Sequence, residues 1–322
     1  MPARRPARFR LLLLLPALAA GCAVVPECGP GQGDVVPVTL DRGLPVVPAR
    51  FNGQDARLLL DTGAAGLFLT APGAARLQLP AVPGMFAQAR GSAGEVRASV
   101  VAVARFEFAS LRRDALSLPA LPVPLMENVF EAPVDGFLGV DGLGPGAVEL
   151  DFSQRRAVLF PADRCRLERP AWEGGATQLP SWQSANGRLG VRVLLNGQSL
   201  PALLDTGAQR TRISRRAASL LGVPLPPATA RPSRVVGIGD TPPNSYGFRF
   251  RELRIGDEVL RGPVLSIVDG LPQAAEMVIG ADLLNGRRVL LSYATGQVFM
   301  QPPRTKPVPP TAVPVPPAAS GH

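Results

Sequence analysis

The chain repeats itself, and this repeat constrains the fold more than any other feature of the sequence. Asn-Gly-Gln at 52–54 recurs at 196–198, and each copy is followed by an apolar run and then by Asp-Thr-Gly-Ala, at 61–64 and 205–208. The offset is 144 residues throughout this block. Self-similarity of this kind is the signature of a fold built from repeated units, so we expect one unit in each half of the chain.

The second half of each copy is repeated as well, with the offset reduced to 141 residues. Phe-Leu-Gly at 137–139 is matched by Val-Ile-Gly at 278–280. Two apolar segments of strand length follow each of them, at 148–152, 157–160, 289–293 and 297–300. Two units of about 120 residues therefore make up most of the chain, a size at which each can bury a core of its own.

Composition indicates that these units are built from strands. Gly (34) and Pro (36) together exceed a fifth of the 322 residues, so turns are dense and long helices few. Asn-Gly between apolar strands is a strong hairpin signal. We predict an all-β chain of two related, β-barrel-like lobes, with short helices near 74–77, 215–221 and 282–285. Asp141 and Asp282 are expected to cap two such helices.

The repeat also divides the chain into segments. The N-terminal lobe is expected at 45–163 and the C-terminal lobe at 187–302, with a polar, irregular linker at 164–186 between them. Residues 22–44 would form a tether and the first strand. Residues 303–322 are rich in proline and predict an extended, disordered tail.

The histidine content excludes several kinds of active site. The only histidine, His322, is the last residue of the chain. A Ser-His-Asp triad, a Cys-His pair and a histidine-ligated zinc site all need an imidazole held in a folded site. Three cysteines are too few for a four-cysteine metal site. We therefore expect no metal and no cofactor, and catalysis, if there is any, by carboxylates, hydroxyls, arginine or backbone groups.

The net charge of +9 does not indicate a nucleic-acid partner. Four of the arginines lie in the first ten residues, and the others do not cluster with aromatic residues. We interpret the remaining charge as a solvated, arginine-rich surface, and we expect a monomer that binds no nucleic acid.

The N-terminus has the pattern of an exported lipoprotein. Its arginines precede an apolar stretch at 11–20, which is too short to span a bilayer. The Leu-Ala-Ala-Gly-Cys sequence that ends at Cys22 resembles a lipobox, so we predict a signal peptide at 1–21 and a lipid on Cys22. Ala23 in place of aspartate favours the outer membrane of a bacterial envelope, with the lobes facing the periplasm. A plain secretory signal or a buried N-terminal helix are the alternatives.

Export would also place two cysteines in an oxidising compartment. Cys28 and Cys165 could form a disulfide there, which would tie the N-terminal segment to the region between the two copies. Spacing alone does not fix the geometry of a pair, so two separate thiols are the alternative.

The repeated Asp-Thr-Gly is the candidate for chemistry. A single Asp-x-Gly at a strand end is often only a turn. Here Asp61 and Asp205 each follow three apolar residues, and two lobes packed about an approximate two-fold axis would bring their loops face to face. Carboxylates about 3 Å apart cannot both ionise cheaply and share one proton, an effect for which aspartic proteases are the standard example. Such a pair can activate a water and protonate a carbonyl oxygen.

On these motifs the sequence resembles the aspartic protease clan, both pepsin-like and retropepsin-like. The resemblance covers most of residues 45–300 and implies the bilobal acid protease fold. It implies that Asp61 and Asp205 are the catalytic pair, that the threonine after each aspartate joins the two loops, and that the glycine after that allows close approach and donates N–H bonds to the carboxylates. These supporting residues are Thr62, Gly63, Thr206 and Gly207.

The resemblance is mixed in type. Two copies in one chain resemble pepsin, whereas Ala64 and Ala208, in place of serine or threonine, resemble the retropepsins, which dimerise single lobes. Alanine removes a hydroxyl hydrogen bond to the carboxylate. A pair that lacks this bond is expected to keep its shared proton to higher pH, which predicts activity from mildly acidic to neutral pH.

Two glycine-rich segments fall where the family carries flaps that close over a substrate. The first contains Gly91 and Gly94, and the second contains Gly237 and Gly239. Ordinary surface turns are the alternative interpretation of both segments.

The sequence therefore predicts an aspartic endopeptidase that is held in the cell envelope by a lipid and cleaves extended polypeptide segments bound between its lobes. The alternative is an envelope lipoprotein of the same fold that binds peptides or partners without turnover. Both Asp-Thr-Gly triplets are intact, which favours activity.

Overall fold

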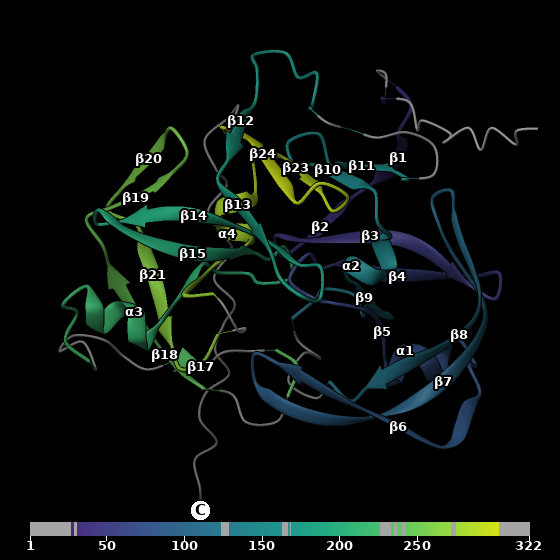
Figure 1. Ribbon diagram of the computed structural model, residues 1–322. Helices are drawn as coiled ribbons and strands as arrows, with labels where there is room; N and C mark the ends of the chain where they lie inside the picture. The colour runs from purple at the N-terminus through teal and green to yellow at the C-terminus, as the bar shows by residue number, and fades with distance from the viewer. Residues whose placement is uncertain are drawn as a thin grey trace, which may run out of the picture.

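The computed structural model describes residues 27–28, 31–123, 129–162, 167, 169–225, 233–234, 237–239, 243–271 and 275–302. Within them the chain is nearly all strand and forms two lobes joined by a shared sheet (Figure 1). The two copies of the repeat correspond to the two lobes, which confirms the predicted bilobal, all-β fold. No helix of the described residues is long and apolar enough to cross a membrane.

The N-terminal lobe is built on an eight-stranded sheet of order β2-β3-β4-β9-β5-β8-β7-β6. Its strands, in chain order, are β2 (Thr39–Asp41), β3 (Leu44–Phe51), β4 (Gln54–Leu60), β5 (Leu67–Thr70), β6 (Ala81–Gly91), β7 (Gly94–Phe108), β8 (Leu111–Leu121) and β9 (Gly136–Leu138). The sheet folds over on itself, because β3 pairs with β7 as well as with its neighbours β2 and β4.

The C-terminal lobe repeats the same central strands in a ten-stranded sheet of order β17-β18-β21-β16-β22-β15-β14-β19-β20, with β13 beside β14. Its strands are β13 (Ser181–Gln183), β14 (Leu189–Leu195), β15 (Gln198–Leu204), β16 (Arg212–Ser214), β17 (Ser233–Arg234), β18 (Asn244–Arg249), β19 (Glu252–Ile255), β20 (Glu258–Arg261), β21 (Val264–Val268) and β22 (Met277–Ile279).

A six-stranded sheet joins the lobes, with the order β1-β11-β10-β23-β24-β12. Three strands come from each half: β1 (Asp34–Pro37), β10 (Ala147–Asp151) and β11 (Arg156–Phe160), then β12 (Thr177–Leu179), β23 (Arg288–Ser292) and β24 (Gln297–Gln301). At its centre β10 and β23 pair antiparallel, with Val148 opposite Leu291 and Leu150 opposite Val289. Because 148 and 289 are equivalent in the repeat, as are 150 and 291, the two copies pair through the same edge.

The Asn-Gly hairpins form as the sequence predicts. Asn52 and Gly53 have φ of 52° and 81°, and Asn196 and Gly197 have φ of 51° and 88°. Positive φ at both central residues is the type I′ turn, whose twist matches that of the flanking strands. These turns fix the registers of β3 with β4 and of β14 with β15, and so position Leu60 and Leu204, the last residues of β4 and β15.

The apolar-Gly strands run directly beside the strands that lead to the aspartates. β9 is parallel to β4, with Leu138 opposite Leu60, and β22 is parallel to β15, with Ile279 opposite Leu204. A Cβ on Gly139 would lie 2.5 Å from the carbonyl oxygen of Ala64, and one on Gly280 would lie 2.6 Å from that of Ala208. Glycine is required at both positions because the Asp-Thr-Gly-Ala loop packs against the backbone there.

The helices agree with the prediction in part. Short helices lie where they were expected, as α1 (Ala71–Arg76), α3 (Arg215–Leu220) and α4 (Ala281–Leu284), and α2 (Val140–Leu143) is the counterpart of α4 in the first copy. The prediction that Asp141 and Asp282 cap helices is wrong. The N-cap residues are Gly139 and Gly280, and the two aspartates lie inside the first turn.

The segment 164–186 is less irregular than the sequence suggests. It contributes β12 and β13, and β12 pairs with β24 at one edge of the six-stranded sheet, as β1 pairs with β11 at the other. β12 is therefore the counterpart of β1, and the second copy begins before residue 187. Strands of three residues carry too little alternation to be recognised in a polar stretch.

Several predictions concern residues outside the described ranges, namely the signal peptide at 1–21, lipidation of Cys22 and the tail at 303–322. Cys28 is disulfide-bonded. The predicted partner, Cys165, also lies outside the described residues, so this pairing stays a prediction. Cys28 packs against the same cluster of buried side chains as Leu167, two residues beyond Cys165 in the chain.

Candidate active site

The two Asp-Thr-Gly loops begin in the same way. Asp61 and Asp205 are the first residues after β4 and β15, whose last three residues are buried. The N–H of Asp61 donates to the carbonyl of Leu138 at 3.0 Å, and the N–H of Asp205 donates to that of Ile279 at 3.0 Å. Each aspartate is thus held at the end of a buried strand by the apolar-Gly strand of its own lobe.

The two threonines join the loops across the lobe boundary. The N–H of Thr62 donates to Thr206 Oγ1 at 3.1 Å, and the N–H of Thr206 donates to Thr62 Oγ1 at 3.1 Å. Each hydroxyl donates in turn to a carbonyl of the other lobe, Thr62 to Leu204 at 2.9 Å and Thr206 to Leu60. Both threonines are buried, so these four reciprocal bonds are shielded from water and fix the loops relative to each other.

The two carboxyl groups meet at this junction. They are hydrogen-bonded to each other and partly buried. A Cβ on Gly63 would lie 2.2 Å from Cγ of Asp205, and one on Gly207 would lie 2.5 Å from Cγ of Asp61. Each glycine therefore lies against the aspartate of the opposite loop. A side chain at either position would occupy space that a carboxyl group fills.

Backbone donors orient each carboxyl group. Asp61 Oδ1 accepts from the N–H groups of Gly63 and Ala64, both at 3.0 Å. Asp205 Oδ1 accepts from Gly207 at 2.9 Å and from Ala208 at 3.0 Å. The two sides are equivalent, as expected for related loops about a two-fold axis. In each carboxyl group Oδ2 makes none of these backbone bonds.

The electrostatics of the two aspartates differ. Burial, then the charge of Asp205 and the hydrogen bond with it, raise the pKa of Asp61 well above its ordinary value. Burial also raises the pKa of Asp205, but the charge of Arg212 and the hydrogen bond with Asp61 oppose that rise. The pair titrates as a unit. The two groups share one proton, and the charge of Arg212 favours the ionised form of Asp205.

The glycine-rich segments of the two lobes touch each other. Gly91 and Gly94 flank the tip of the β6–β7 hairpin, and at this tip the N–H of Ala93 donates to the carbonyl of Ile238 at 2.9 Å. A Cβ on Gly91 would lie 2.5 Å from Cβ of Ile238, and one on Gly239 would lie 2.2 Å from the carbonyl carbon of Ala93. A Cβ on Gly237 would fall on the side chain of Ser92. The lobes therefore touch at this point as well as at the threonines and in the shared six-stranded sheet.

Comparison with known protein families agrees with this geometry. A family model described as Aspartyl protease matches the chain twice, over residues 47–141 and 191–283, which together exceed half of its length. The chain belongs to the aspartyl protease family. Each matched segment holds one Asp-Thr-Gly and one apolar-Gly strand, and the family is one of peptidases, which act on polypeptides. A search of curated proteins gave no match.

Two arginines beside the dyad of this family member were not singled out by the sequence. Arg188 Nη1 donates to the carbonyl of Gly63 at 3.3 Å. Burial lowers the pKa of Arg188, and the charges of Asp205 and Asp61 oppose this. Burial likewise lowers the pKa of Arg212, which the charges of Asp205 and Asp282 oppose. The repeat does mark these arginines, because with an offset of 144 residues they occupy positions where the first copy has the apolar residues Leu44 and Phe68.

A buried tyrosine, Tyr293, lies within electrostatic reach of Asp61. Burial and then the charge of Asp61 raise the pKa of Tyr293, so this residue stays protonated. Its hydroxyl is buried and has no hydrogen-bond partner among the described residues. The first copy has Phe152 at the equivalent position, so only the second copy carries a hydroxyl there.

Asp141 and Asp282 serve structure rather than chemistry, and in different ways. Asp282 accepts from the N–H of Thr211 at 2.8 Å and from its hydroxyl at 2.7 Å, and so fastens α4 to the loop that follows the second Asp-Thr-Gly. Asp141 is largely exposed and pairs with Arg113 at 3.2 Å. Neither takes part in the contacts between the two catalytic-type loops.

Proposed function

We propose that the protein is an aspartic endopeptidase in which Asp61 and Asp205 together activate one water molecule. The observation that carries this proposal is the hydrogen bond between two partly buried carboxyl groups from different lobes, held in place by the reciprocal threonines. Such a pair holds one proton between two groups, which is the state needed for an acid and a base to act together.

The chemistry follows from the position of that proton. Asp205, ionised beside Arg212, removes a proton from a water bound between the two carboxyl groups, and the oxygen attacks the carbonyl carbon of the peptide bond. Asp61 donates its proton to the carbonyl oxygen. The tetrahedral intermediate then collapses, the C–N bond breaks, and the proton held by Asp205 passes to the amine that leaves. As the C–N bond breaks, one hydroxyl of the intermediate gives its proton back to Asp61 and its oxygen forms the C=O bond of the new acid, so the dyad again holds one proton.

The test is incubation of the mature protein with an unfolded polypeptide such as casein. We expect discrete fragments, and we expect pepstatin, an inhibitor that binds aspartic dyads, to suppress them. The alternative function, peptide binding without turnover, predicts saturable binding of the same polypeptide with no fragments. Intact substrate after prolonged incubation across the acidic and neutral range would reject the proposed activity.

The activity is expected to extend from mildly acidic to neutral pH. Cleavage requires one carboxyl group ionised and the other protonated, so the rate falls at low pH when both are protonated and at high pH when both are ionised. Raised pKa values in the pair move the high-pH limit upward, and Ala64 and Ala208 provide no hydroxyl to oppose this. The measurement is kcat/KM from pH 2 to 9, and cleavage confined to below about pH 4 would contradict the prediction.

The proposal includes the cell envelope as the place of action. The disulfide at Cys28 supports it, since stable disulfides form in oxidising compartments. Lipidation at Cys22 predicts that the protein expressed in a bacterial host fractionates with membranes and takes up labelled fatty acid. Cys22→Ser is expected to abolish the label. If the label is incorporated equally by Cys22→Ser, the anchor lies elsewhere.

A further inference from the structure

The two halves of the site carry opposite chemistry at equivalent positions. Phe68 on β5 is paired with Phe137 on β9, and Arg212 on β16 is paired with Val278 on β22. Since 137 and 278 correspond in the repeat, the pairing confirms that Arg212 occupies in the C-terminal lobe the place that Phe68 occupies in the N-terminal lobe. At this position the N-terminal lobe carries a bulky apolar side chain and the C-terminal lobe carries a cation.

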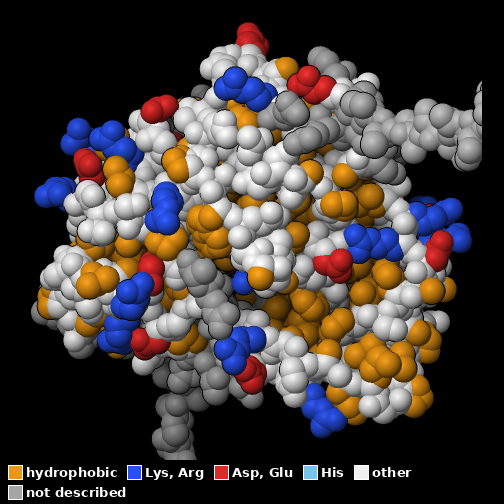
Figure 2. Space-filling model, viewed as in Figure 1, with side chains coloured by type: hydrophobic (Ala, Val, Ile, Leu, Met, Phe, Trp, Pro, Cys, Tyr) orange, Lys and Arg blue, Asp and Glu red, His pale blue; other side chains and the backbone are white. Residues whose placement is uncertain are grey.

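The surroundings of Phe68 show what this place faces. Phe68 packs against a buried cluster, and so do Ala89 and Val96 of the β6–β7 hairpin and Ile238 of the opposite glycine-rich segment. This is the side of the sheet that the two touching segments cover, whereas Leu69, the next residue, lies in the main core with no exposed surface. Figure 2 shows the molecule hollowed between the lobes, with apolar side chains gathered on the side of the N-terminal lobe.

Strand alternation places Arg212 on the corresponding side of the C-terminal lobe. Ile213 is fully buried in the main core, so its neighbour Arg212 projects from the other face of the sheet. Arg212 is only partly buried. Within the described residues its guanidinium has no hydrogen bond and no ion pair, and the acidic groups that act on it are Asp205 and Asp282.

These two acids do not satisfy the arginine. Asp282 is committed to the N–H and hydroxyl of Thr211. Asp205 is the member of the dyad that must act on water. A partly buried guanidinium with five N–H donors and no direct partner favours an anion brought from outside, because burial of an uncompensated cation is costly.

A second cation reinforces the first. Arg188 lies at the position of Leu44 in the repeat, and Leu44 belongs to the same cluster as Phe68. Arg188 reaches the Asp-Thr-Gly loop of the other lobe through the carbonyl of Gly63. The C-terminal lobe therefore presents two arginines where the N-terminal lobe presents two apolar side chains.

Resting on the proposed function, we propose that Arg212, assisted by Arg188, binds the carboxylate of an acidic substrate residue on one side of the scissile bond, while Phe68 binds an apolar residue on the other side. The substrate class is thus an extended peptide with an aspartate or glutamate on the side of the C-terminal lobe. Guanidinium and carboxylate match in charge and in geometry and can form two parallel hydrogen bonds.

The test compares two peptides that differ in one residue, glutamate or glutamine, at each position near the cleaved bond. We expect kcat/KM to favour glutamate at one position by about tenfold or more, since a charge-assisted hydrogen bond of this kind has that worth. Arg212→Leu, which gives the position the apolar character of Phe68, is expected to bring the ratio of kcat/KM for the two peptides to about one, whatever change in absolute rate follows from the loss of the charge beside Asp205. Arg212→Lys is expected to keep part of it.

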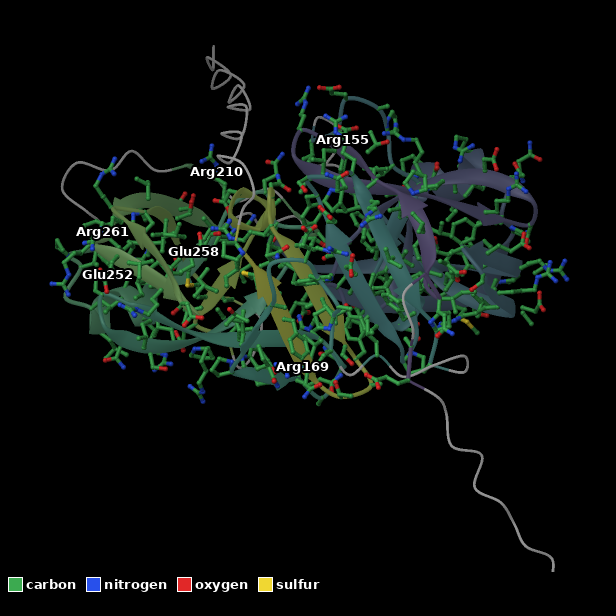
Figure 3. The ribbon with its side chains drawn as sticks, turned by 90° about the horizontal axis from the view of Figure 1, so that it is seen from above. Arg155, Arg169, Arg210, Glu252, Glu258 and Arg261 are labelled. Carbon is green, nitrogen blue, oxygen red and sulfur yellow. The ribbon has the colours of Figure 1, made fainter. Side chains whose placement is uncertain are left out.

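The control is Arg261→Leu, since Arg261 is exposed at the outer end of the C-terminal lobe, far from the lobe boundary (Figure 3). It should leave the preference unchanged. If Arg212 only adjusts the dyad, Arg212→Leu will shift the pH profile by the same amount for both peptides and leave their ratio intact, which overturns the proposal. Each variant is therefore compared at its own optimal pH.

A binding measurement separates this inference from the proposed activity. Asp61→Asn protein is titrated with the same glutamate and glutamine peptides by calorimetry. Tighter binding of the glutamate peptide that is lost in Asp61→Asn/Arg212→Leu supports the inference even if no turnover is found. Cleavage of both peptides at equal rates, with equal affinities, rejects the inference and leaves the proposed activity standing.

Discussion

Asp61→Asn and Asp205→Asn are each expected to reduce kcat/KM for peptide cleavage by at least about 10⁴-fold. Asparagine has the same shape and retains an oxygen that can accept from Gly63 and Ala64, or from Gly207 and Ala208. It can neither take a proton from water nor share one with its neighbour. General acid and general base catalysis each contribute about 10²–10⁴-fold, and here one pair of groups supplies both.

The same variants are expected to be at least as stable as the parent at neutral pH. The folded state raises the pKa of both aspartates, so it favours their protonated forms. The folded state therefore loses stability as the pH rises from the ordinary aspartate value through the raised values. Asparagine cannot ionise and avoids this loss. Thermal unfolding at pH 7 measures the effect, and a markedly lower Tm in either variant would contradict it.

A matched control is available in Asp141→Asn. Asp141 lies two residues after Gly139, at the end of the apolar-Gly motif of the first copy. It is largely exposed, and its carboxylate pairs only with Arg113. Its replacement should leave kcat/KM within about twofold, since surface ion pairs contribute little. The double variant Asp61→Asn/Asp205→Asn should be no less active than either single variant, because the two groups act as a unit. Turnover above about one part in a hundred in a single variant would reject the shared-proton mechanism.

Gly63→Ala and Gly207→Ala are expected to lower kcat/KM by about 10²-fold or more. A Cβ at these positions would lie 2.2 Å or 2.5 Å from the carboxyl carbon of the opposite aspartate, so the two loops must separate. Displacement of catalytic groups by about 1 Å is enough to cost this much. Neither glycine has a positive φ, so the effect comes from contact between the loops and not from backbone strain.

Gly53→Ala provides the comparison. Gly53 has a φ of 81°, and a Cβ added there would meet no atom within 4 Å beyond its chain neighbours, so alanine strains the β3–β4 turn without touching the dyad. We expect a lower Tm with kcat per folded molecule unchanged. The reverse pattern, in which Gly63→Ala or Gly207→Ala lowers Tm and leaves kcat intact, would show that the close approach of the loops serves stability alone.

Much of the fold was accessible from the sequence because the repeat carries it. Residues 52–54 and 196–198 specify their turns locally, and the glycines at 139 and 280 are required by contacts that the matching motifs imply. The two Asp-Thr-Gly triplets likewise indicate the family. These features depend on short-range chemistry or on similarity between the copies, and both can be read without coordinates.

The features that the sequence did not predict depend on differences or on distant contacts. Arg188 and Arg212 lie at positions where the two copies differ, so the motifs that the copies share do not mark them. β12 and β13 owe their strand structure to partners β24 and β14, which lie far along the chain or beyond a turn. Asp282 looked like a helix cap, but its carboxylate is taken by Thr211, 71 residues away.

The pairing of β10 with β23 has a consequence for any attempt to divide the molecule. Each of these strands presents to the other the edge that its counterpart presents in return, with Val148 opposite Leu291 and Leu150 opposite Val289. A single half produced alone would leave that edge open and complementary to itself. Two identical halves should then associate in the manner of a homodimer, and fusion of two such genes would yield a chain of the present form without any new interface.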